Sequence, residues 1–486
     1  MPELSPKRTP SWWVSLIPFV VLIGILSIVI KEYGADSLAG GSQTALVICT
    51  GLVLTIALTV YKIPWKDLDE AIMGNIKSIG SAVVILLLIG GIAGSWMLSG
   101  IVPTLIFYGL KILSPKIFLL AVCLICCLVS VMTGSSWTTI ATIGVAFIGI
   151  GMALGYSEAL TAGAIISGSY FGDKISPLSD TTNLASSVTG TPLFTHIRYM
   201  MITTVPSIVI ACIIYLVISL NHSSADAIRV EEISSALEST FHLSPWLLLV
   251  PALTGVLIAR KVPAMLTLLA AILMASAAAL IAQPGLVAFV GAGDFQPLDF
   301  SNAFRGTFSS IYGDTAIATG SGMLDELVQT HGMCGMLSTI FLILCAAAFG
   351  GAMTGAGMIQ SITEMLTRRI RRRTSTVAST VGTGIFCNMV TGDQYLSVIL
   401  TCSLYKDLYK KNGFESRLLS RSTEDAATVT SVLIPWNSCG MTQSTVLKVP
   451  TLDYLPYCFF NLISPLMSIT VAAIGYKIVH LKSSEE

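Results

Sequence analysis

A run of polar residues interrupts an otherwise apolar stretch over 158–190 and could bind a small cation. It holds two carboxylates, Asp173 and Asp180, with Lys174 and Pro177 between them. Proline removes a backbone donor and opens a helix, which frees carbonyl oxygens. Hard oxygen ligands suit Na⁺, and a carboxylate inside a membrane is costly unless it pairs, protonates or binds a cation. We therefore expect a site that takes Na⁺ and H⁺ in turn, with ligands from Asp173, Ser179, Asp180, Thr181 and Asn183.

Asp173 and Lys174 could instead form a structural ion pair in an aqueous loop. Asp180 follows Pro177 and precedes Thr181, so we expect it to be the stronger ligand of the two carboxylates. The spacing of these residues is specific for a helix break, whereas it does not specify the ion.

Two further apolar stretches, 117–150 and 374–404, are each interrupted at a Thr-Gly pair. Two half-helices would point their ends at each of these tips, where helix dipoles favour ions. Asp393 is the only acid at either tip, and its alternative role is that of a solvated loop acid. The expected ligands here are Thr133, Ser135, Ser136, Asn388, Thr391 and Asp393, and the carboxylates expected to hold Na⁺ are Asp173, Asp180 and Asp393.

A second broken stretch, 422–447, carries Glu424 and Asp425 followed by Pro435, Asn437 and Ser438. We expect Asp425, Asn437 and Ser438 to contribute to the site. Alternatively, the two acids mark a helix N-terminus at the inner surface, where the helix dipole stabilises negative charge.

These breaks recur at a constant spacing of 258 residues, from 133 to 391, from 177 to 435 and from 192 to 450. Helix breaks at matching places in two halves of a membrane protein indicate the substrate site of a secondary transporter. His196 and Arg198 follow Pro192. They either anchor a helix end or, since His titrates near neutral pH, sense pH.

Composition places the chain in lipid. Hydrophobic residues make up 53% and charged residues 11%, with a mean hydropathy of +0.80 and no net charge. No basic face indicates nucleic-acid binding, and no nucleotide-binding motif supports ATP-driven transport. The 11 Cys lie mostly in apolar runs, where thiols pack as small hydrophobes.

We expect an all-α polytopic membrane protein with about ten crossings, because a spanning helix needs about 20 apolar residues. The 27 Lys and Arg residues fall mostly on one side when the N-terminus is placed inside, as the positive-inside rule requires. Basic residues flank 374–404 on both sides, which favours a re-entrant hairpin there and an inverted counterpart over 117–150. Polar residues 220–243 are expected to form an outer loop and 283–330 an outer linker. The expected units are 1–78 with two transmembrane helices, inverted repeat 79–219, the linker region 220–333 with two transmembrane helices, and inverted repeat 334–486.

The residues over 172–182, 391–395 and 433–440 resemble the signature motifs of the NhaC family of Na⁺/H⁺ antiporters, and the resemblance extends from about 10 to 480. It implies inverted repeats with two re-entrant hairpins, often in homodimers, with Na⁺ and H⁺ as transported ions and no cofactor, in a bacterial cytoplasmic membrane with both termini inside. The chain departs from the family pattern at Ala427, Lys448 and Met441-Thr442-Gln443.

The function expected first is Na⁺/H⁺ exchange by alternating access, not an enzymatic activity. The alternative is exchange of a small organic acid such as malate or lactate coupled to Na⁺ or H⁺, for which Lys174 and Lys448 are the available cations. A remote alternative is an intramembrane aspartyl protease built on Asp173 and Asp393, because such an enzyme needs two carboxylates that share a proton.

Overall fold

The structure, a computed structural model, describes residues 10–33, 40–222, 227–260, 262–294, 296–317, 325, 328–367, 370 and 372–481. Within these ranges it is helical and contains no β-strand, only two isolated bridges, Thr315–Thr330 and Phe414–His480. Among the described residues, eight helices are long and apolar enough to cross a membrane, or up to ten when two bent pairs are each taken as one span. The expectation of an all-α polytopic protein with about ten crossings is confirmed.

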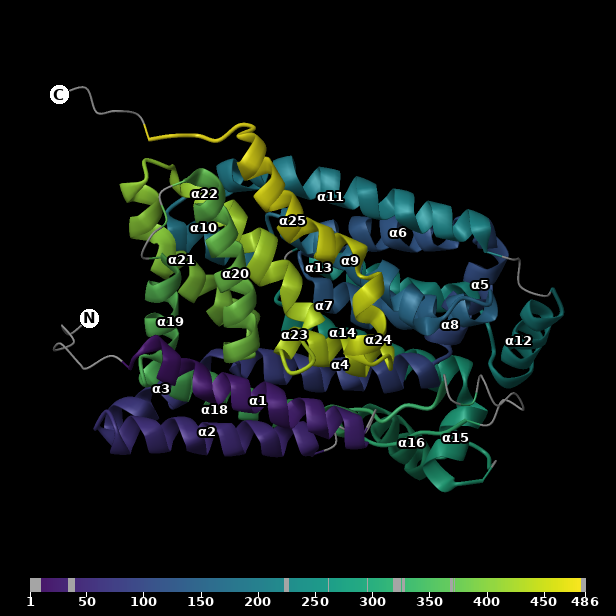
Figure 1. Cartoon of the computed structure of the whole chain (residues 1–486). Helices are drawn as coiled ribbons and strands as arrows, with labels where there is room; N and C mark the ends of the chain where they lie inside the picture. The colour runs from purple at the N-terminus through teal and green to yellow at the C-terminus, as the bar shows by residue number, and fades with distance from the viewer. Residues whose placement is uncertain are drawn as a thin grey trace.

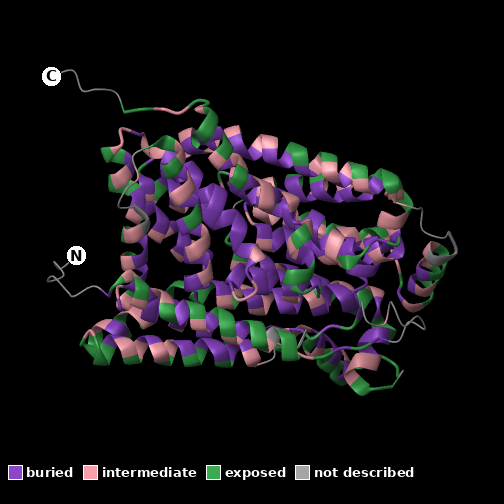
Figure 2. Cartoon of the chain, viewed as in Figure 1, coloured by how far each residue is buried: buried purple, intermediate pink, exposed green. Residues whose placement is uncertain are grey.

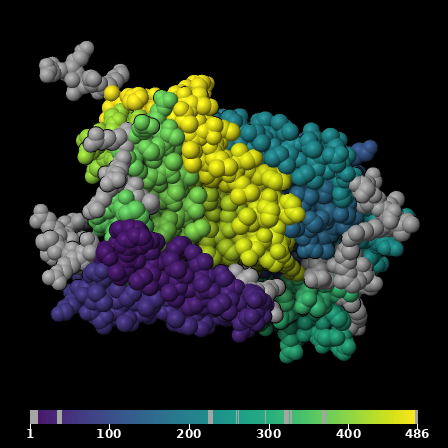
Figure 3. Space-filling view, viewed as in Figure 1, coloured from purple at the N-terminus to yellow at the C-terminus, as the bar shows by residue number. Residues whose placement is uncertain are grey.

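Four N-terminal helices form one edge of the bundle (Figure 1). Helices α3 and α4 form one nearly continuous helical stretch over Trp65–Leu98. Its apolar part is α4, which begins at Gly80 next to the expected start at residue 79, whereas α3 carries several charged residues. Buried side chains of α1 and α2 share a core with those of α18 in the second unit, and Figure 3 shows the two regions adjoining on one face. The bounds are α1 (Trp12–Tyr33), α2 (Gly41–Thr59), α3 (Trp65–Ser78) and α4 (Gly80–Leu98).

The first unit contains a hairpin followed by a broken helix. The hairpin turns at Gly134, and the broken helix is interrupted between Ile175 and Asp180, as the sequence predicts. A π-helix (Ile140–Gly144) lies within the second arm of the hairpin. The helices are α5 (Ile101–Ile112), α6 (Phe118–Thr133), α7 (Ser136–Thr139), α8 (Val145–Ala153), α9 (Glu158–Ile175), α10 (Asp180–Thr189) and α11 (Leu193–Asn221).

The second unit repeats this order, with a hairpin turn at Gly392 and a helix broken around Pro435. A π-helix, η6 (Glu424–Thr428), and a short 3-10 turn (Ser431–Leu433) precede this break. The helices are α18 (Leu337–Gly355), α19 (Met358–Thr367), α20 (Arg373–Thr391), α21 (Gln394–Lys411), α22 (Ser416–Thr423), α23 (Ser438–Leu447), α24 (Thr451–Tyr454) and α25 (Phe459–Ile474).

Within the expected outer loop over 220–243, helix α12 (Ala227–Thr240) forms, and the position of this segment outside the membrane stays a prediction. Ile233, Leu237 and Phe241 recur every four residues, and all three are buried in the larger core. This spacing places them on one helix face. The segment is therefore an amphipathic helix, although its composition is polar.

The expected linker over 283–330 is also more ordered than its composition indicates. Helices α15 (Pro284–Ala292) and α16 (Phe300–Tyr312) pack closely. A Cβ on Gly306 would lie 2.1 Å from the carbonyl oxygen of Val287, so glycine permits this approach. Helices α13 (Leu249–Ala259) and α14 (Ala264–Ala282) are the two spans expected between the units.

Helix α1 begins and helix α25 ends toward the same end of the molecule (Figure 1). The orientation of that end and the inverted relation of the two units stay predictions. Several residues used in the charge argument lie outside the described residues: Lys7, Arg8, Lys261, Glu326, Arg368, Arg369, Arg371 and Lys482.

Candidate functional site

The first helix break is built by local hydrogen bonds to its own backbone. Helix α9 ends at Ile175, and Ser179 begins α10 by accepting a hydrogen bond from the Thr182 N–H. The Asn183 amide donates to the carbonyl oxygens of Pro177 at 3.0 Å and Ser179 at 2.7 Å. Ser179 and Asn183 therefore hold the break in shape, and neither is among the described residues that line the adjacent cavity.

The tip of the first hairpin rests on this break. Gly134 has a φ of 67°, and a Cβ there would lie 2.6 Å from the Cβ of Leu178 and 2.7 Å from its carbonyl carbon. Glycine is needed both for the left-handed conformation and for the close approach. Ser135 then caps α7 by accepting a hydrogen bond from the Thr138 N–H.

Asp173 ties the broken helix to the hairpin. Its carboxylate accepts hydrogen bonds from the Ser136 N–H at 3.1 Å and the Ser136 hydroxyl at 2.7 Å, and its side chain is buried. Ser136 thus positions Asp173 and is not a described lining residue of the cavity. Two donors at the N-terminus of α7 stabilise the ionised carboxylate, since hydrogen bonds to a charged group are stronger than neutral ones.

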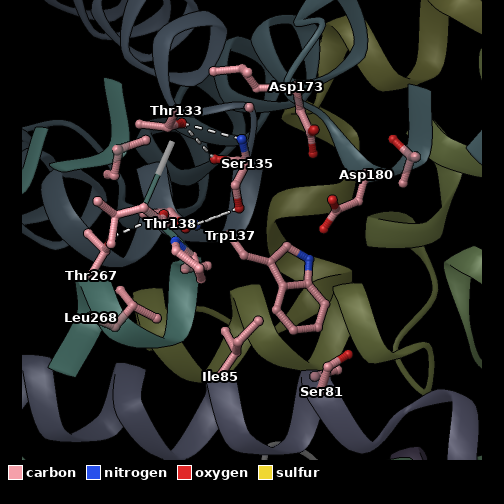
Figure 4. A pocket seen from close by; sticks show the side chains of 18 of the residues that line it. Ser81, Ile85, Thr133, Ser135, Trp137, Thr138, Asp173, Asp180, Thr267 and Leu268 are labelled. Carbon is pink, nitrogen blue, oxygen red and sulfur yellow. Dashed lines mark hydrogen bonds between the residues drawn. The ribbon is translucent and has the colours of Figure 1, made fainter. Parts of the chain in front are cut away.

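Asp173 and Asp180 line one cavity of about 360 Å³. Figure 4 shows both carboxylates directed into the same space beside the Trp137 ring. Thr133, Ser135 and Thr181 line it from the first unit, and α4 and α14 form the opposite wall. Among the described lining residues, the two aspartates are the only charged groups. Two carboxylates in one cavity repel each other, so a cation or a proton between them is favoured.

The second tip and break reproduce the local geometry of the first at the 258-residue spacing. Gly392 has a φ of 63°, and Asp393 caps α21 by accepting a hydrogen bond from the Leu396 N–H. The Thr133 hydroxyl lies 3.2 Å from that of Thr139, and the Thr391 hydroxyl lies 3.0 Å from that of Ser397. The equal spacing seen in the sequence therefore extends to backbone conformation and side-chain hydrogen bonds.

The acid of the second tip, Asp393, is enclosed by protein, although Gln394 and Tyr395, which follow it, line the cavity. The Ser438 N–H donates to the Gly392 carbonyl at 2.8 Å, and the Asn437 amide donates to the Asn388 carbonyl at 3.1 Å. Five predicted ligands lie in this buried cluster, and none is a described lining residue of the cavity: Asn388, Thr391, Asp393, Asn437 and Ser438.

The three predicted Na⁺ carboxylates do not meet. Within the described ranges, no three Asp, Glu, His or Cys side chains gather as a metal site. The oxygens of Asp393 face the Leu396 N–H at 2.9 Å and the Ser438 hydroxyl at 3.5 Å, whereas Asp173 bonds Ser136. Separate partners of this kind give no support to a protease in which Asp173 and Asp393 share a proton.

Lys174 pairs with Asp425 and not with Asp173. Both side chains are fully buried, and Asp425 also accepts a hydrogen bond from the Thr203 hydroxyl at 2.9 Å. The alternatives of an Asp173–Lys174 pair in an aqueous loop and of surface positions for Glu424 and Asp425 are therefore wrong, because all four side chains are buried. Buried residues fill the middle of the bundle (Figure 2). Lys448 donates to the Gln329 carbonyl, away from the aspartates.

His196 is buried, and its Nδ1 lies 2.8 Å from the Ser420 hydroxyl, so it anchors the start of α11 to α22.

Several residues near the site were not among the predicted ligands. Trp137, Gln394 and Tyr395 line the cavity, and Arg421 is buried 3.9 Å from Asp425. Trp137, Gln394 and Tyr395 belong to the two predicted tips, and Gln394 and Tyr395 lie in the motif over 391–395, but none of the three is among the predicted ligands.

Comparisons with known proteins agree on one family. A model of the Na⁺/H⁺ antiporter family matches residues 9–170 and 168–476. The chain is 38% identical to the Na⁺/H⁺ antiporter NhaC of Alkalihalophilus pseudofirmus, over 88% of this chain and 89% of the relative. It is 34% identical to the Na⁺/H⁺ antiporter NhaC of Bacillus subtilis, over 86% and 90%. It is also 34% identical to the malate-2H⁺/Na⁺-lactate antiporter of Bacillus subtilis, over 86% of each chain.

Proposed function

The chain belongs to the Na⁺/H⁺ antiporter family, and from that premise we propose that it exchanges Na⁺ for H⁺ across a bacterial cytoplasmic membrane, with the cation held between Asp173 and Asp180. The observation that carries this assignment is the cavity in which these two carboxylates are the only described charged groups. Thr133, Ser135 and Thr181 supply further oxygens around it, a donor set that suits Na⁺.

The two carboxylates have different roles in this proposal. Asp173 is buried and fixed by Ser136, so it forms the rigid wall of the site. Asp180 begins α10, is exposed to the cavity, and supplies the second charge. Two negative charges inside a membrane are unfavourable, so one Na⁺ or one H⁺ bound by the protein compensates them whenever the site crosses.

The predicted membrane orientation indicates to which side of the membrane the cavity opens. Its wall includes Ser81 near the start of α4 and Ala264 at the start of α14. If the N-terminus lies inside, both helices begin at the cytoplasmic surface, and this conformation is open to the cytoplasm. A cysteine at Ser81 would then react with a membrane-impermeant maleimide from the inside only.

Exchange of an organic acid remains the second candidate, because one relative is a malate-2H⁺/Na⁺-lactate antiporter. A carboxylate substrate needs a cation beside it. Lys174 is engaged by Asp425, and Lys448 bonds Gln329, so neither described lysine is placed for that role. The acidic cavity favours the inorganic cation.

The test is proton movement in inside-out vesicles that hold an imposed pH gradient. We expect NaCl alone to collapse the gradient, and Asp180→Asn to lower that response by at least about tenfold, because the site loses one charge. Asp407→Asn, an exposed acid on α21, is the matched control. A response that requires added malate or lactate would contradict Na⁺/H⁺ exchange and support the second candidate.

A further inference from the structure

A second group of charged side chains lies behind the cation site and is fully buried. It consists of Lys174 on α9, Arg421 on α22, and Glu424 and Asp425 on η6, and all four have no exposed surface. We call it the inner charge cluster. Lys174 and Asp425 form an ion pair, and the Arg421 Nε lies 3.9 Å from the second oxygen of Asp425. Ionisable groups inside a membrane are costly and mark function by default.

Glu424 is the unsatisfied member of this cluster. Neither of its carboxylate oxygens has a hydrogen-bond partner, and the Thr428 hydroxyl, four residues on, has none either. A buried carboxylate without partners is far less costly when it is protonated than when it is ionised. In this conformation Glu424 is therefore neutral.

Arg421, a cation of the same cluster, likewise lacks hydrogen bonds. None of its three side-chain nitrogens has a hydrogen-bond partner, and its guanidinium lies over the Tyr199 ring at 4.7 Å. The Arg421 guanidinium and the Glu424 carboxyl, three residues apart and both without hydrogen bonds, can pair once Glu424 loses its proton. The π-helix of η6 begins at Glu424, and such irregular turns occur frequently at functional sites.

The count of charges links this cluster to the cation site. With Glu424 neutral, Lys174 and Arg421 exceed Asp425 by one positive charge, and with Glu424 ionised the cluster is balanced. Asp173 precedes Lys174 in the last turn of α9, and both act electrostatically on Glu424. While the cavity holds no Na⁺, the charge of Asp173 offsets the excess. Na⁺ bound at Asp173 removes that offset and favours the ionised form of Glu424.

Other titratable groups stand on the elements packed against η6, and none competes for this role within the described residues. Cys402 and Cys387 are thiols, and Tyr199, Tyr405 and Tyr409 are phenols. Helix α25 carries no charged residue. The acid on α10 is Asp180, which faces the cavity, and the imidazole of His196 on α11 bonds Ser420.

From this geometry we propose that Glu424 is the proton-binding residue of the exchange, separate from the Na⁺ site and coupled to it through Lys174 and Asp425. When Na⁺ enters between Asp173 and Asp180, the O–H bond of Glu424 breaks and the proton passes to water on the open side. One positive charge enters as one leaves. This inference rests on the proposed Na⁺/H⁺ exchange and assigns its proton to a residue.

The experiment measures, in purified protein, the binding of radioactive sodium and the release of protons into weak buffer between about pH 6 and pH 9. The unmodified protein should release protons as Na⁺ binds, and its Na⁺ affinity should rise roughly tenfold across this range, a typical coupling between two sites. Glu424→Gln should bind Na⁺ without releasing protons, with an affinity that no longer changes with pH. Glu232→Gln, an exposed acid on α12, is the control.

Proton release from Glu424→Gln equal to that of the unmodified protein would overturn the assignment and place the proton on Asp173 or Asp180. If Glu424→Gln does not fold or does not bind Na⁺, Glu424→Asp decides. It keeps a titratable group, so proton release should persist with a shifted pH midpoint, and an unchanged midpoint would overturn the proposal. Absence of Na⁺ binding in the unmodified protein would instead contradict the proposed function itself.

Discussion

The two Thr-Gly tips have the same backbone and different surroundings. Gly134 and Gly392 adopt the same left-handed conformation, and Ser135 and Asp393 each cap the helix that follows. The first tip faces a cavity beside Asp173 and Asp180. At the second tip, Ser438 and Asn437 cover the turn and Asp393 is buried outside the described lining, although Gln394 and Tyr395 reach the same cavity. The same backbone therefore occurs with different charge and access, and our proposal that the first tip binds the ion rests on this difference.

The ion pair between Lys174 on α9 and Asp425 on η6 connects the first unit to the second. We expect its loss to have the largest effect on stability. Lys174→Met removes the nearer cation of the buried Asp425 and leaves only Arg421, 3.9 Å away, and breaking a buried pair costs about 3–5 kcal/mol of stability. We expect a marked fall in the unfolding temperature of the detergent-solubilised protein. Lys410→Met, at an exposed position on α21, should leave it unchanged. Equal unfolding temperatures for the two variants would show that the pair does not connect the two units.

Substitution of alanine for each tip glycine, Gly134 and Gly392, distinguishes an effect on stability from an effect on transport. Both positions have positive φ, and both lack room for a Cβ, with Leu178 and Ala346 each 2.6 Å away. Each substitution should cost about 1–2 kcal/mol or more, the penalty of the left-handed conformation. Only Gly134→Ala should also lower Na⁺-driven exchange per folded molecule, by about tenfold at 1.4 kcal/mol per decade. Equal losses of exchange would remove the functional difference between the tips.

The two tips can also be compared at the serines next to their acids, Ser136 beside Asp173 and Ser438 beside Asp393, where we expect smaller effects. The Ser136 hydroxyl donates to Asp173 at 2.7 Å, whereas the Ser438 hydroxyl lies 3.5 Å from Asp393. A hydrogen bond to a charged group contributes about 1.5–3 kcal/mol, but Ser136 keeps its N–H. We expect Ser136→Ala to weaken Na⁺ binding about fivefold and Ser438→Ala less than about twofold. Radioactive sodium binding measures both, and the reverse order would contradict the assignment.

The smallest effect is expected at the C-terminal ends of the two broken helices. Gly190 and Lys448 occupy matching positions, with φ of 72° and 57°. No atom lies within 4 Å of a Cβ added at Gly190, so Gly190→Ala should cost only the conformational penalty of about 1 kcal/mol. Lys448→Gly should change stability by less than about 1 kcal/mol. Thermal unfolding checks both, and neither variant should change Na⁺ affinity if Lys448 takes no part in substrate binding.

The sequence predicted the repeated features of the molecule because they depend on local residue types. Thr-Gly pairs and prolines between apolar stretches located both tips and both breaks, and Asp173 and Asp180 were found with them. The partner of Lys174 could not be predicted, since it lies 251 residues away and depends on how α9 packs against η6. The same holds for the cavity wall from α4 and α14, whose lining residues carry no polar motif.

Polar composition alone did not predict the structure where the spacing of apolar residues determined it. Helix α12 was concealed by its acids, although Ile233 and Leu237 mark its buried face. The prediction of Asp393 as a Na⁺ ligand rests on its being the only acid at either tip. Our proposal excludes Asp393 because Ser438 and Asn437, from a distant segment, cover the turn beside it.

The central claim is that the first tip and break bind the cation and the second do not. The most direct measurement is equilibrium binding of radioactive sodium to Asp173→Asn, Asp180→Asn and Asp393→Asn, each verified as folded. The account predicts that the first two variants lose Na⁺ affinity by about 30-fold or more, as expected for removal of a charged ligand, and that Asp393→Asn keeps it within about threefold. Loss of binding in Asp393→Asn with binding retained in Asp180→Asn would contradict it.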